Sequence, residues 1–320
     1  MAFLFISRNN VHARYYKKLT RKLPLKSKVH CMGLPRFTAL KYFSKAKKVD
    51  FNKIIAEQLL RKQARNKLWK NPLIIKSYSA LMYLVERCRF AKYYDLLQSE
   101  SPQALVIWNG NKLPNVTVCM AAKALGVTTY YYENGLLPGT TSLDPKGINF
   151  AASVPRDSQF YLNFDPQGKL PFSAPDLIPR ANHKKRCKFD AIKLPKKYLF
   201  VPFQVPHDTQ IACYSPWLKS MEEYYDAVVS AVKQLNDPEL KVVFKEHPSW
   251  HKHYEHLYDR NDVAVFANGN CTRELINGAE AVITINSTVG LESLLLDKKV
   301  ITLGLACYNI DELVLHASDQ

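Results

Sequence analysis

Short apolar runs of strand type alternate along this chain with longer segments in which apolar residues recur every three or four positions. The short runs are typical of buried strands, whereas the longer periodicity predicts amphipathic helices. In the first half we predict strands at residues 2–6, 28–32, 104–108 and 127–132, and helices at 12–23, 51–70, 74–97 and 115–125. In the second half we predict strands at 198–203, 241–244, 263–266, 281–285 and 299–303, and helices at 216–235, 272–278 and 289–296. This alternation indicates an α/β fold.

The segment between the two halves, residues 136–195, has no long periodic stretch. It contains many prolines, glycines and charged residues, including a basic cluster at 183–186, and we interpret it as active-site loops followed by an interdomain linker. The fold prediction is therefore two Rossmann-like domains facing a cleft, residues 1–195 and 196–320. Enzymes of this type usually end in further helices, so we expect that such helices were trimmed from, or deleted in, this chain.

Polar residues follow three strands of the predicted second domain at the point where each strand ends. They are Gln204, Asp208 and Gln210 after 198–203, Lys245 and His247 after 241–244, and Ser287 and Thr288 after 281–285. In an open α/β sheet, ligands bind outside the carboxyl ends of the strands. Serine or threonine at such a position can cap the next helix and leave amide groups directed at a phosphate. These placements predict an enzyme.

Positive charge is concentrated in the first third of the chain. Residues 1–100 contain 23 Lys and Arg against 5 Asp and Glu, or +18, whereas the other 220 residues contain 22 against 23, or −1. Such a field attracts anionic lipid, nucleic acid or acidic glycan. No nucleic-acid-binding module is recognisable, and the basic residues are interleaved with Leu, Ile and Tyr at helical spacing. We therefore favour a peripheral contact with an anionic membrane surface and expect no nucleic acid partner; the alternative is a solvated, solubilising surface.

Several classes of protein are disfavoured by what the sequence lacks. No apolar run approaches the ~20 residues of a membrane span, and residues 1–6 are too short for a secretory signal, so we expect a cytoplasmic location. The 7 cysteines are scattered without a Cys-x-x-Cys pair, which speaks against a disulfide framework or a structural zinc site. No GxGxxG motif or P-loop is present, so neither a dinucleotide cofactor nor ATP hydrolysis is indicated.

Five motifs occur in order along the second and last thirds of the chain. They are Glu133-Asn134-Gly135, Asp144-Pro-Lys146-Gly147-Ile-Asn149, Gln204-x-x-x-Asp208-x-Gln210, Lys245-x-His247-Pro248 and Asn286-Ser287-Thr288-x-Gly290-x-Glu292. Together they resemble the retaining β-Kdo (3-deoxy-D-manno-oct-2-ulosonic acid) glycosyltransferases of bacterial capsule and O-antigen synthesis, which use CMP-Kdo and have GT-B architecture. The basic first hundred residues carry little of this resemblance.

The resemblance implies transfer of Kdo from CMP-β-Kdo to a glycan or glycolipid acceptor with retention of configuration, and it implies no metal or other cofactor. Asp208 would be the nucleophile and Glu133 the general base, although the two roles are interchangeable at this level. His247, Lys245 and the helix start at Ser287-Thr288 would stabilise the leaving CMP. The further substrate-binding candidates are Gln204, Gln210, Lys146, Asn149, Asn134, Gly135 and Glu292.

Each site residue also has a purely structural interpretation. Glu133-Asn134-Gly135 could be a simple turn, and Asp208 could be only a helix cap. His247 could be structural or belong to a zinc-binding cluster with the other histidines of 247–256, although their spacing is poor for one helix face. His207 is as plausible a loop residue as a catalytic acid.

Other functional classes also remain open. The alternatives are a CDP-alcohol phosphotransferase of the teichoic-acid type, an inverting CMP-sialic acid transferase, and a non-catalytic scaffold of capsule assembly. We expect a cytoplasmic location, peripheral on the inner face of the bacterial cytoplasmic membrane, because the basic first third would attract anionic lipid.

Overall fold

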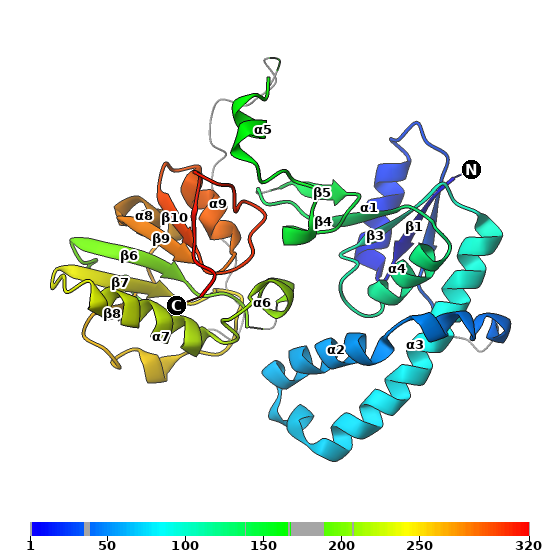
Figure 1. The fold of residues 1–320 in the computed structure, drawn as a ribbon, viewed down its shortest axis with the longest axis horizontal. Helices are drawn as coiled ribbons and strands as arrows, with labels where there is room; N and C mark the ends of the chain where they lie inside the picture. The colour runs from blue at the N-terminus through cyan, green and yellow to red at the C-terminus, as the bar shows by residue number, and fades with distance from the viewer. Residues whose placement is uncertain are drawn as a thin grey trace. The chain divides into compact units, whose positions relative to one another are not determined.

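The computed structural model describes residues 2–34, 39–137, 139–165, 167, 189–206 and 208–319. Their contacts divide the chain into two compact units (Figure 1). The first unit comprises Met1–Gly135 and Thr141–Ser153, and the second comprises Leu136–Thr140 and Val154–Gln320. The second unit therefore begins earlier in the sequence than the boundary predicted after residue 195. The basic cluster at 183–186 and His207 lie outside the described residues.

The first unit contains a five-stranded sheet in the order β2-β1-β3-β4-β5. Its strands are β1 (Phe3–Ser7), β2 (Ser27–Cys31), β3 (Ala104–Trp108), β4 (Thr129–Asn134) and β5 (Thr141–Asp144). The first four are parallel, and β5 pairs antiparallel with β4. Strand β1 supplies Ile6 to one buried cluster and Phe5 to another, which explains its continuous apolar sequence. Strand β5 was not predicted, because most of its residues are exposed and it has no apolar alternation.

The helices of the first unit match the predicted ones closely. They are α1 (Asn10–Thr20), α2 (Phe51–Arg65), α3 (Pro72–Glu100) and α4 (Asn115–Ala124), with 3-10 helices η1 (Leu40–Tyr42), η2 (Lys45–Lys48), η3 (Lys67–Lys70) and η4 (Asn149–Ala151). The predicted break between the helices at 51–70 and 74–97 is confirmed, since the Asn71 side chain caps α3 and Pro72 is its first residue. None of the helices in the described residues is long and apolar enough to cross a bilayer.

The second unit contains a six-stranded sheet in the order β11-β10-β9-β6-β7-β8, with all neighbouring strands parallel. Its strands are β6 (Lys197–Pro202), β7 (Leu240–Lys245), β8 (Ala264–Phe266), β9 (Ala281–Thr284), β10 (Lys299–Thr302) and β11 (Leu315–His316). Its helices are α5 (Ser158–Leu162), α6 (Thr209–Tyr214), α7 (Met221–Gln234), α8 (Thr272–Gly278), α9 (Thr288–Leu294) and the 3-10 helix η5 (Glu255–Leu257). Helix α7 begins five residues later than the helix predicted at 216–235, and Ser220 is its N-cap residue.

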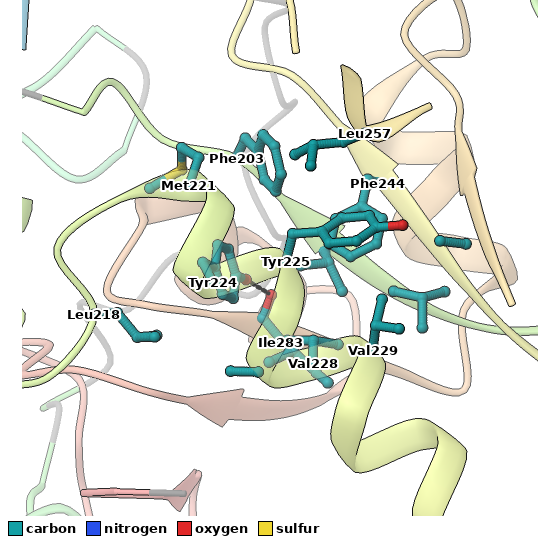
Figure 2. Packing of buried hydrophobic residues seen from close by; sticks show 14 of the residues in the cluster. Phe203, Leu218, Met221, Tyr224, Tyr225, Val228, Val229, Phe244, Leu257 and Ile283 are labelled. Atoms are coloured by element: carbon teal, nitrogen blue, oxygen red, sulfur yellow. Dashed lines mark hydrogen bonds between the residues drawn. The ribbon is translucent and has the colours of Figure 1, made fainter. Parts of the chain in front are cut away.

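The largest core cluster of the second unit lies between α7 and the sheet (Figure 2). Tyr224 and Tyr225 of α7 are fully buried, and the Tyr225 ring stacks on Phe244 of β7 at a centroid distance of 4.8 Å. The Tyr224 hydroxyl donates to the Ile283 carbonyl of β9 at 2.6 Å, so a buried polar group is satisfied within an apolar layer. Adjacent positions of α7 thus contact β7 and β9.

Both sheets have the strand orders of doubly wound folds. Counted within its own unit, the second sheet has the order 3-2-1-4-5-6, and the first has 2-1-3-4 followed by its antiparallel edge strand. In such sheets the order reverses at one point, and ligands bind at the carboxyl ends of the strands there. The reversal falls between β6 and β9 in the second unit and between β1 and β3 in the first. These two positions are where functional residues are expected.

Candidate functional site

A reciprocal pair of side chains joins the strands at the reversal point of the second unit. Gln204 follows β6 and Asn286 follows β9, and both are buried. Gln204 Nε2 donates to Asn286 Oδ1 at 3.0 Å, and the Asn286 backbone N–H donates to Gln204 Oε1 at 3.2 Å. Both ends of the Gln204 amide therefore have protein partners. This geometry gives Gln204 a positioning role, while its predicted contact with a sugar stays a prediction.

Asn286 also anchors α6, the short helix that carries Asp208 at its start. Asn286 Nδ2 donates to the carbonyls of Gln210 and Tyr214, at 3.0 Å each. Gln210 Nε2 donates in return to the Asn286 carbonyl at 3.1 Å. Asn286 is 1% exposed, and sequence analysis placed it in a motif without assigning it a role. The structure shows that it fixes α6 against the end of β9.

Asp208 is the N-cap residue of α6, since its carboxylate accepts from the Thr209 backbone N–H. Asp208 is therefore a helix cap, although the helix it caps was not predicted, and its predicted catalytic role stays a prediction. Helix α6 is too short to show periodicity, which is why sequence analysis read these residues as a loop. The hydrogen bond from the Thr209 N–H orients the Asp208 carboxylate. A capping carboxylate can still have a chemical role.

Next to Asp208, two polar atoms of α6 are buried without a hydrogen-bond partner among the described residues. They are Thr209 Oγ1 and Gln210 Oε1. Buried polar atoms ordinarily find a partner, so atoms of this kind are common where a ligand or water completes the site. The contribution of Gln210 to a binding site stays a prediction.

The His247 ring has a defined tautomer. The Ser249 backbone N–H donates to His247 Nδ1 at 3.2 Å, and Ser249 Oγ lies 2.8 Å from the same nitrogen. An atom that accepts from a backbone N–H has no proton of its own, so the neutral ring carries its proton on Nε2. His247 can therefore present an N–H donor while neutral, which is the property needed to contact a phosphate oxygen.

Lys245 is held at the end of β7 by backbone carbonyls. Its Nζ donates to the carbonyls of Asn268 and Asn270, at 2.9 and 2.6 Å. The next residue, Glu246, is 1% exposed and accepts hydrogen bonds from Tyr254 N at 2.7 Å and Tyr258 Oη at 2.9 Å. Sequence analysis treated Glu246 as a spacer of the motif. It is a buried anchor that fixes the loop after β7.

The histidines of residues 247–256 have separate partners. His253 Nδ1 lies 2.8 Å from Glu246, and His256 Nε2 lies 3.6 Å from Glu222. Among the described residues, no group of three or more His, Cys, Asp and Glu is arranged to hold a metal ion.

The predicted helix cap at Ser287 is confirmed, since Ser287 Oγ accepts from Val289 N at 3.2 Å. The Tyr308 hydroxyl donates to the Ser287 carbonyl, and it packs against Gly290 so closely that a Cβ there would lie 2.3 Å from it. This contact explains the glycine of the Ser-Thr-x-Gly motif. Thr288 and Glu292 lie on the same helix, α9, and no described contact assigns them a ligand.

The end of β4 in the first unit carries Glu133, held by donors from two strands. Glu133 Oε2 accepts from Asn109 Nδ2 at 2.6 Å, and Oε1 accepts from Trp108 Nε1 at 3.2 Å and Asn134 N at 2.9 Å. Glu133 and Asn134 are the last residues of β4 and pair with β5, so they do not belong to a simple turn. The carboxylate is thus fixed by three donors rather than left in a turn.

His12 extends this cluster across the reversal point between β1 and β3. Its ring stacks on Trp108, with centroids 4.2 Å apart and planes at 15°. Burial lowers the His12 pKa, the charge of Glu133 opposes that shift, and Arg8 adds to it. Sequence analysis missed His12, Trp108 and Asn109, because their proximity depends on β1 and β3 being neighbours. The polar run after β1 was the available signal.

Asp144 organises the loop that carries Lys146 and Asn149. Its carboxylate accepts from Lys146 N at 2.7 Å, Gly147 N at 3.1 Å, and the backbone and hydroxyl of Ser153 at 2.8 and 2.6 Å. Burial alone would raise the Asp144 pKa, but these hydrogen bonds outweigh it and lower the pKa. Asn149 takes a left-handed conformation, with φ of 56°. The motif around Asp144 is therefore a rigid loop of the first unit.

Comparisons with known proteins show which family and which fold this chain resembles. The profile of the family described as "Capsule polysaccharide biosynthesis protein" matches residues 180–317. The chain is 39% identical to Protein FixF of Sinorhizobium fredii, over 86% of this chain and 67% of FixF. It is 25% identical to the capsule polysaccharide export protein KpsS of Escherichia coli, over 59% of this chain and 64% of KpsS. The chain thus spans about two thirds of the length of each relative.

Among solved structures, the chain is similar to Thermosulfurimonas dismutans KpsC, described as a beta Kdo 2,7 transferase, with a TM-score of 0.54 and 15% identity. That match covers 99% of this chain and 83% of KpsC. The two sheets, parallel except for the edge strand β5, and this similarity define a GT-B fold with two Rossmann-like units, and the predicted fold class is confirmed. The chain belongs to the capsule polysaccharide biosynthesis family.

Proposed function

We propose that this protein is a retaining glycosyltransferase that moves Kdo from CMP-β-Kdo to a glycan or glycolipid acceptor in the synthesis of a bacterial surface polysaccharide. One observation carries the proposal: in the second unit, the motif residues that follow β6, β7 and β9 lie at the carboxyl ends of parallel strands, and the strand order reverses between β6 and β9. Membership in the capsule polysaccharide biosynthesis family and the fold shared with a β-Kdo transferase support it.

In this proposal, Asp208 attacks the anomeric carbon of Kdo while the bond to the CMP phosphate breaks. The electron pair of that bond leaves with CMP, and a Kdo ester of the Asp208 carboxylate results. The capping contact with Thr209 and the Asn286 network would hold the nucleophile in position. A hydrogen-bond donor of the substrate would pair with the buried Gln210 Oε1.

The leaving CMP gains charge on its phosphate, and donors fixed in advance lower the cost of that charge. His247 supplies the Nε2 proton while neutral, because Nδ1 accepts from Ser249. Lys245 and the start of α9 at Ser287 and Thr288 supply further positive potential.

In the second step, Glu133 removes the proton of the acceptor hydroxyl, which attacks the anomeric carbon and releases Asp208. Two displacements at the same carbon give net retention. No cofactor enters this scheme. We place the reaction on the inner face of the bacterial cytoplasmic membrane, with CMP-Kdo and a membrane-linked or glycan acceptor as partners.

The proposal is tested by incubating the protein with CMP-Kdo, CMP-sialic acid and CDP-glycerol in separate reactions without acceptor, and measuring release of CMP. Release from CMP-Kdo alone supports the proposal. Release from CMP-sialic acid alone supports a sialyltransferase, cleavage of CDP-glycerol alone supports a phosphotransferase, and no turnover with any donor or acceptor supports a scaffold.

A further inference from the structure

The hairpin of α2, η3 and α3 has a free end without a core of its own. The residues of α3 that are buried, such as Glu86, Phe90 and Leu97, all lie in its second half. Every residue from 66 to 85, all within the described chain, is at least partly exposed. Figure 1 shows this end of the hairpin extending away from the strands of the first unit. We call residues 60–84 the hairpin tip.

The hairpin tip presents large apolar side chains to solvent. On α3, Leu73, Leu81 and Leu84 are 75%, 60% and 45% exposed. Their spacing of eight and three residues places them on one face of the helix, and we call them the leucine stripe. Inward-directed Ile75, Tyr78 and Met82 pack against the core cluster instead. The stripe is therefore an apolar face that the first unit does not cover.

The hairpin tip is also strongly basic. Residues 61–85 contain six Lys and Arg and no Asp or Glu. Arg65, Lys67, Lys70 and Lys76 are all exposed. An apolar face bordered by cations complements an anionic lipid surface, where leucines enter the acyl boundary and lysines remain among the headgroups. A protein partner that bound only the exposed leucines would not require the residues around them to be uniformly positive.

The hairpin tip is held in shape by aromatic contacts. Lys62 Nζ lies 3.9 Å from the Trp69 ring centroid and 5.0 Å from that of Tyr78, and the two rings meet edge to face at 5.0 Å. These contacts fix η3 between the two helices, so the leucine stripe is presented on a preformed element. Tryptophan, tyrosine and lysine are also the residues enriched at the level of lipid headgroups.

We propose that the hairpin tip is a membrane-docking element, in which the leucine stripe inserts into the interface of an anionic bilayer and the basic residues contact the lipid phosphates. This inference adds an insertion site to the general attraction expected from the charge of the first third. It is independent of the sugar donor, because its readout is vesicle binding rather than turnover.

The test compares binding to vesicles of phosphatidylcholine with phosphatidylglycerol and to vesicles of phosphatidylcholine alone. The stripe variant is Leu73→Gln, Leu81→Gln and Leu84→Gln, which keeps helix propensity. Its matched control is Leu235→Gln, Leu313→Gln and Leu315→Gln in the second unit, where the leucines are 64%, 46% and 69% exposed. We expect the stripe variant to lose at least about tenfold in affinity for the anionic vesicles, and the control to stay within about twofold of the unchanged protein.

A charge variant, Lys67→Gln, Lys70→Gln and Lys76→Gln, separates insertion from attraction. Its loss of affinity for anionic vesicles should be clear at about 0.1 M salt and smaller at about 1 M, where charges are screened within ~3 Å. The loss of affinity in the stripe variant should persist at both salt concentrations. Equal vesicle binding by the stripe variant and its control would overturn the proposal. A change in molecular mass of the stripe variant in solution would also overturn it, because the stripe would then join copies of this chain.

Discussion

The Asn109 side chain donates to Glu133 Oε2 at 2.6 Å, and this contact joins the ends of β3 and β4. Asn109 adopts a left-handed backbone conformation, with φ of 69°, and Gly110 follows with φ of 71°. A Cβ at Gly110 would lie 2.4 Å from the Tyr131 ring, so the turn is tightly packed. The proposed base is therefore positioned by a turn whose conformation is costly for other residues.

Asn109→Ala should reduce transfer, because Glu133 loses its shortest hydrogen bond and its orientation. We expect kcat to fall about tenfold or more with little change in the affinity for CMP, which binds the other proposed group of residues. The matched control is Asn52→Ala on the exposed face of α2. A large change in CMP affinity with normal kcat would contradict the positioning role.

The His12 pKa should depend on Glu133. Burial lowers the His12 pKa from its usual value near 6.5, and the Glu133 charge partly restores it. In Glu133→Gln that restoring charge is absent, so the His12 pKa should fall further, which NMR titration of the ring can measure. Because the folded-state pKa lies below the unfolded one, stability from this group is present above about pH 6.5 and is lost as the pH falls through the folded-state pKa. An unchanged or higher pKa in the variant would contradict the described geometry.

Gly290→Ala should destabilise the second unit, because the new Cβ would clash with the Tyr308 hydroxyl. We expect a loss of about 1–3 kcal/mol in the free energy of unfolding, measured by denaturant titration. Tyr308→Phe removes the clashing oxygen at the cost of the hydrogen bond to Ser287. The double variant should lose less free energy of unfolding than the sum of the losses in the two single variants. Strictly additive losses would show that the Tyr308 hydroxyl is not the obstacle.

His247→Ala should weaken CMP binding about 10- to 100-fold while leaving the fold intact, because it removes a donor to a charged phosphate. His251→Ala is the control, since it removes an exposed imidazole from the same loop. Isothermal titration with CMP measures both affinities, and circular dichroism checks the fold. Equal affinities for CMP in the two variants would remove His247 from the phosphate site.

Much of the fold was predictable because its central strands are buried on both faces. Strands β1, β3 and β6 appear in the sequence as continuous apolar runs bounded by polar residues, and their positions were predicted to within one or two residues. Elements β5, α6 and β11 were missed because they are short and have little apolar periodicity. Local sequence carries a weak signal for such elements, since tertiary contacts such as those of Asn286 create them.

The geometry around the predicted site residues could not be derived from the sequence. The sequence places Gln204 and Asn286 far apart, and only the pairing of β6 with β9 brings their amides together. The contact between Trp108 and His12 could not be predicted either, because it depends on the pairing of β1 with β3. Glu246 was read as a variable position of its motif, because its partner, the backbone N–H of Tyr254, lies outside that motif.

In the proposed mechanism, Asp208 becomes covalently attached to Kdo during turnover. The most direct measurement is the intact mass of Glu133→Gln after incubation with CMP-β-Kdo, followed by peptide mapping. The account predicts an added mass of one Kdo residue on the peptide containing Asp208, and none in Asp208→Asn. No adduct in Glu133→Gln, together with transfer that persists in Asp208→Asn or an inverted product, would contradict it.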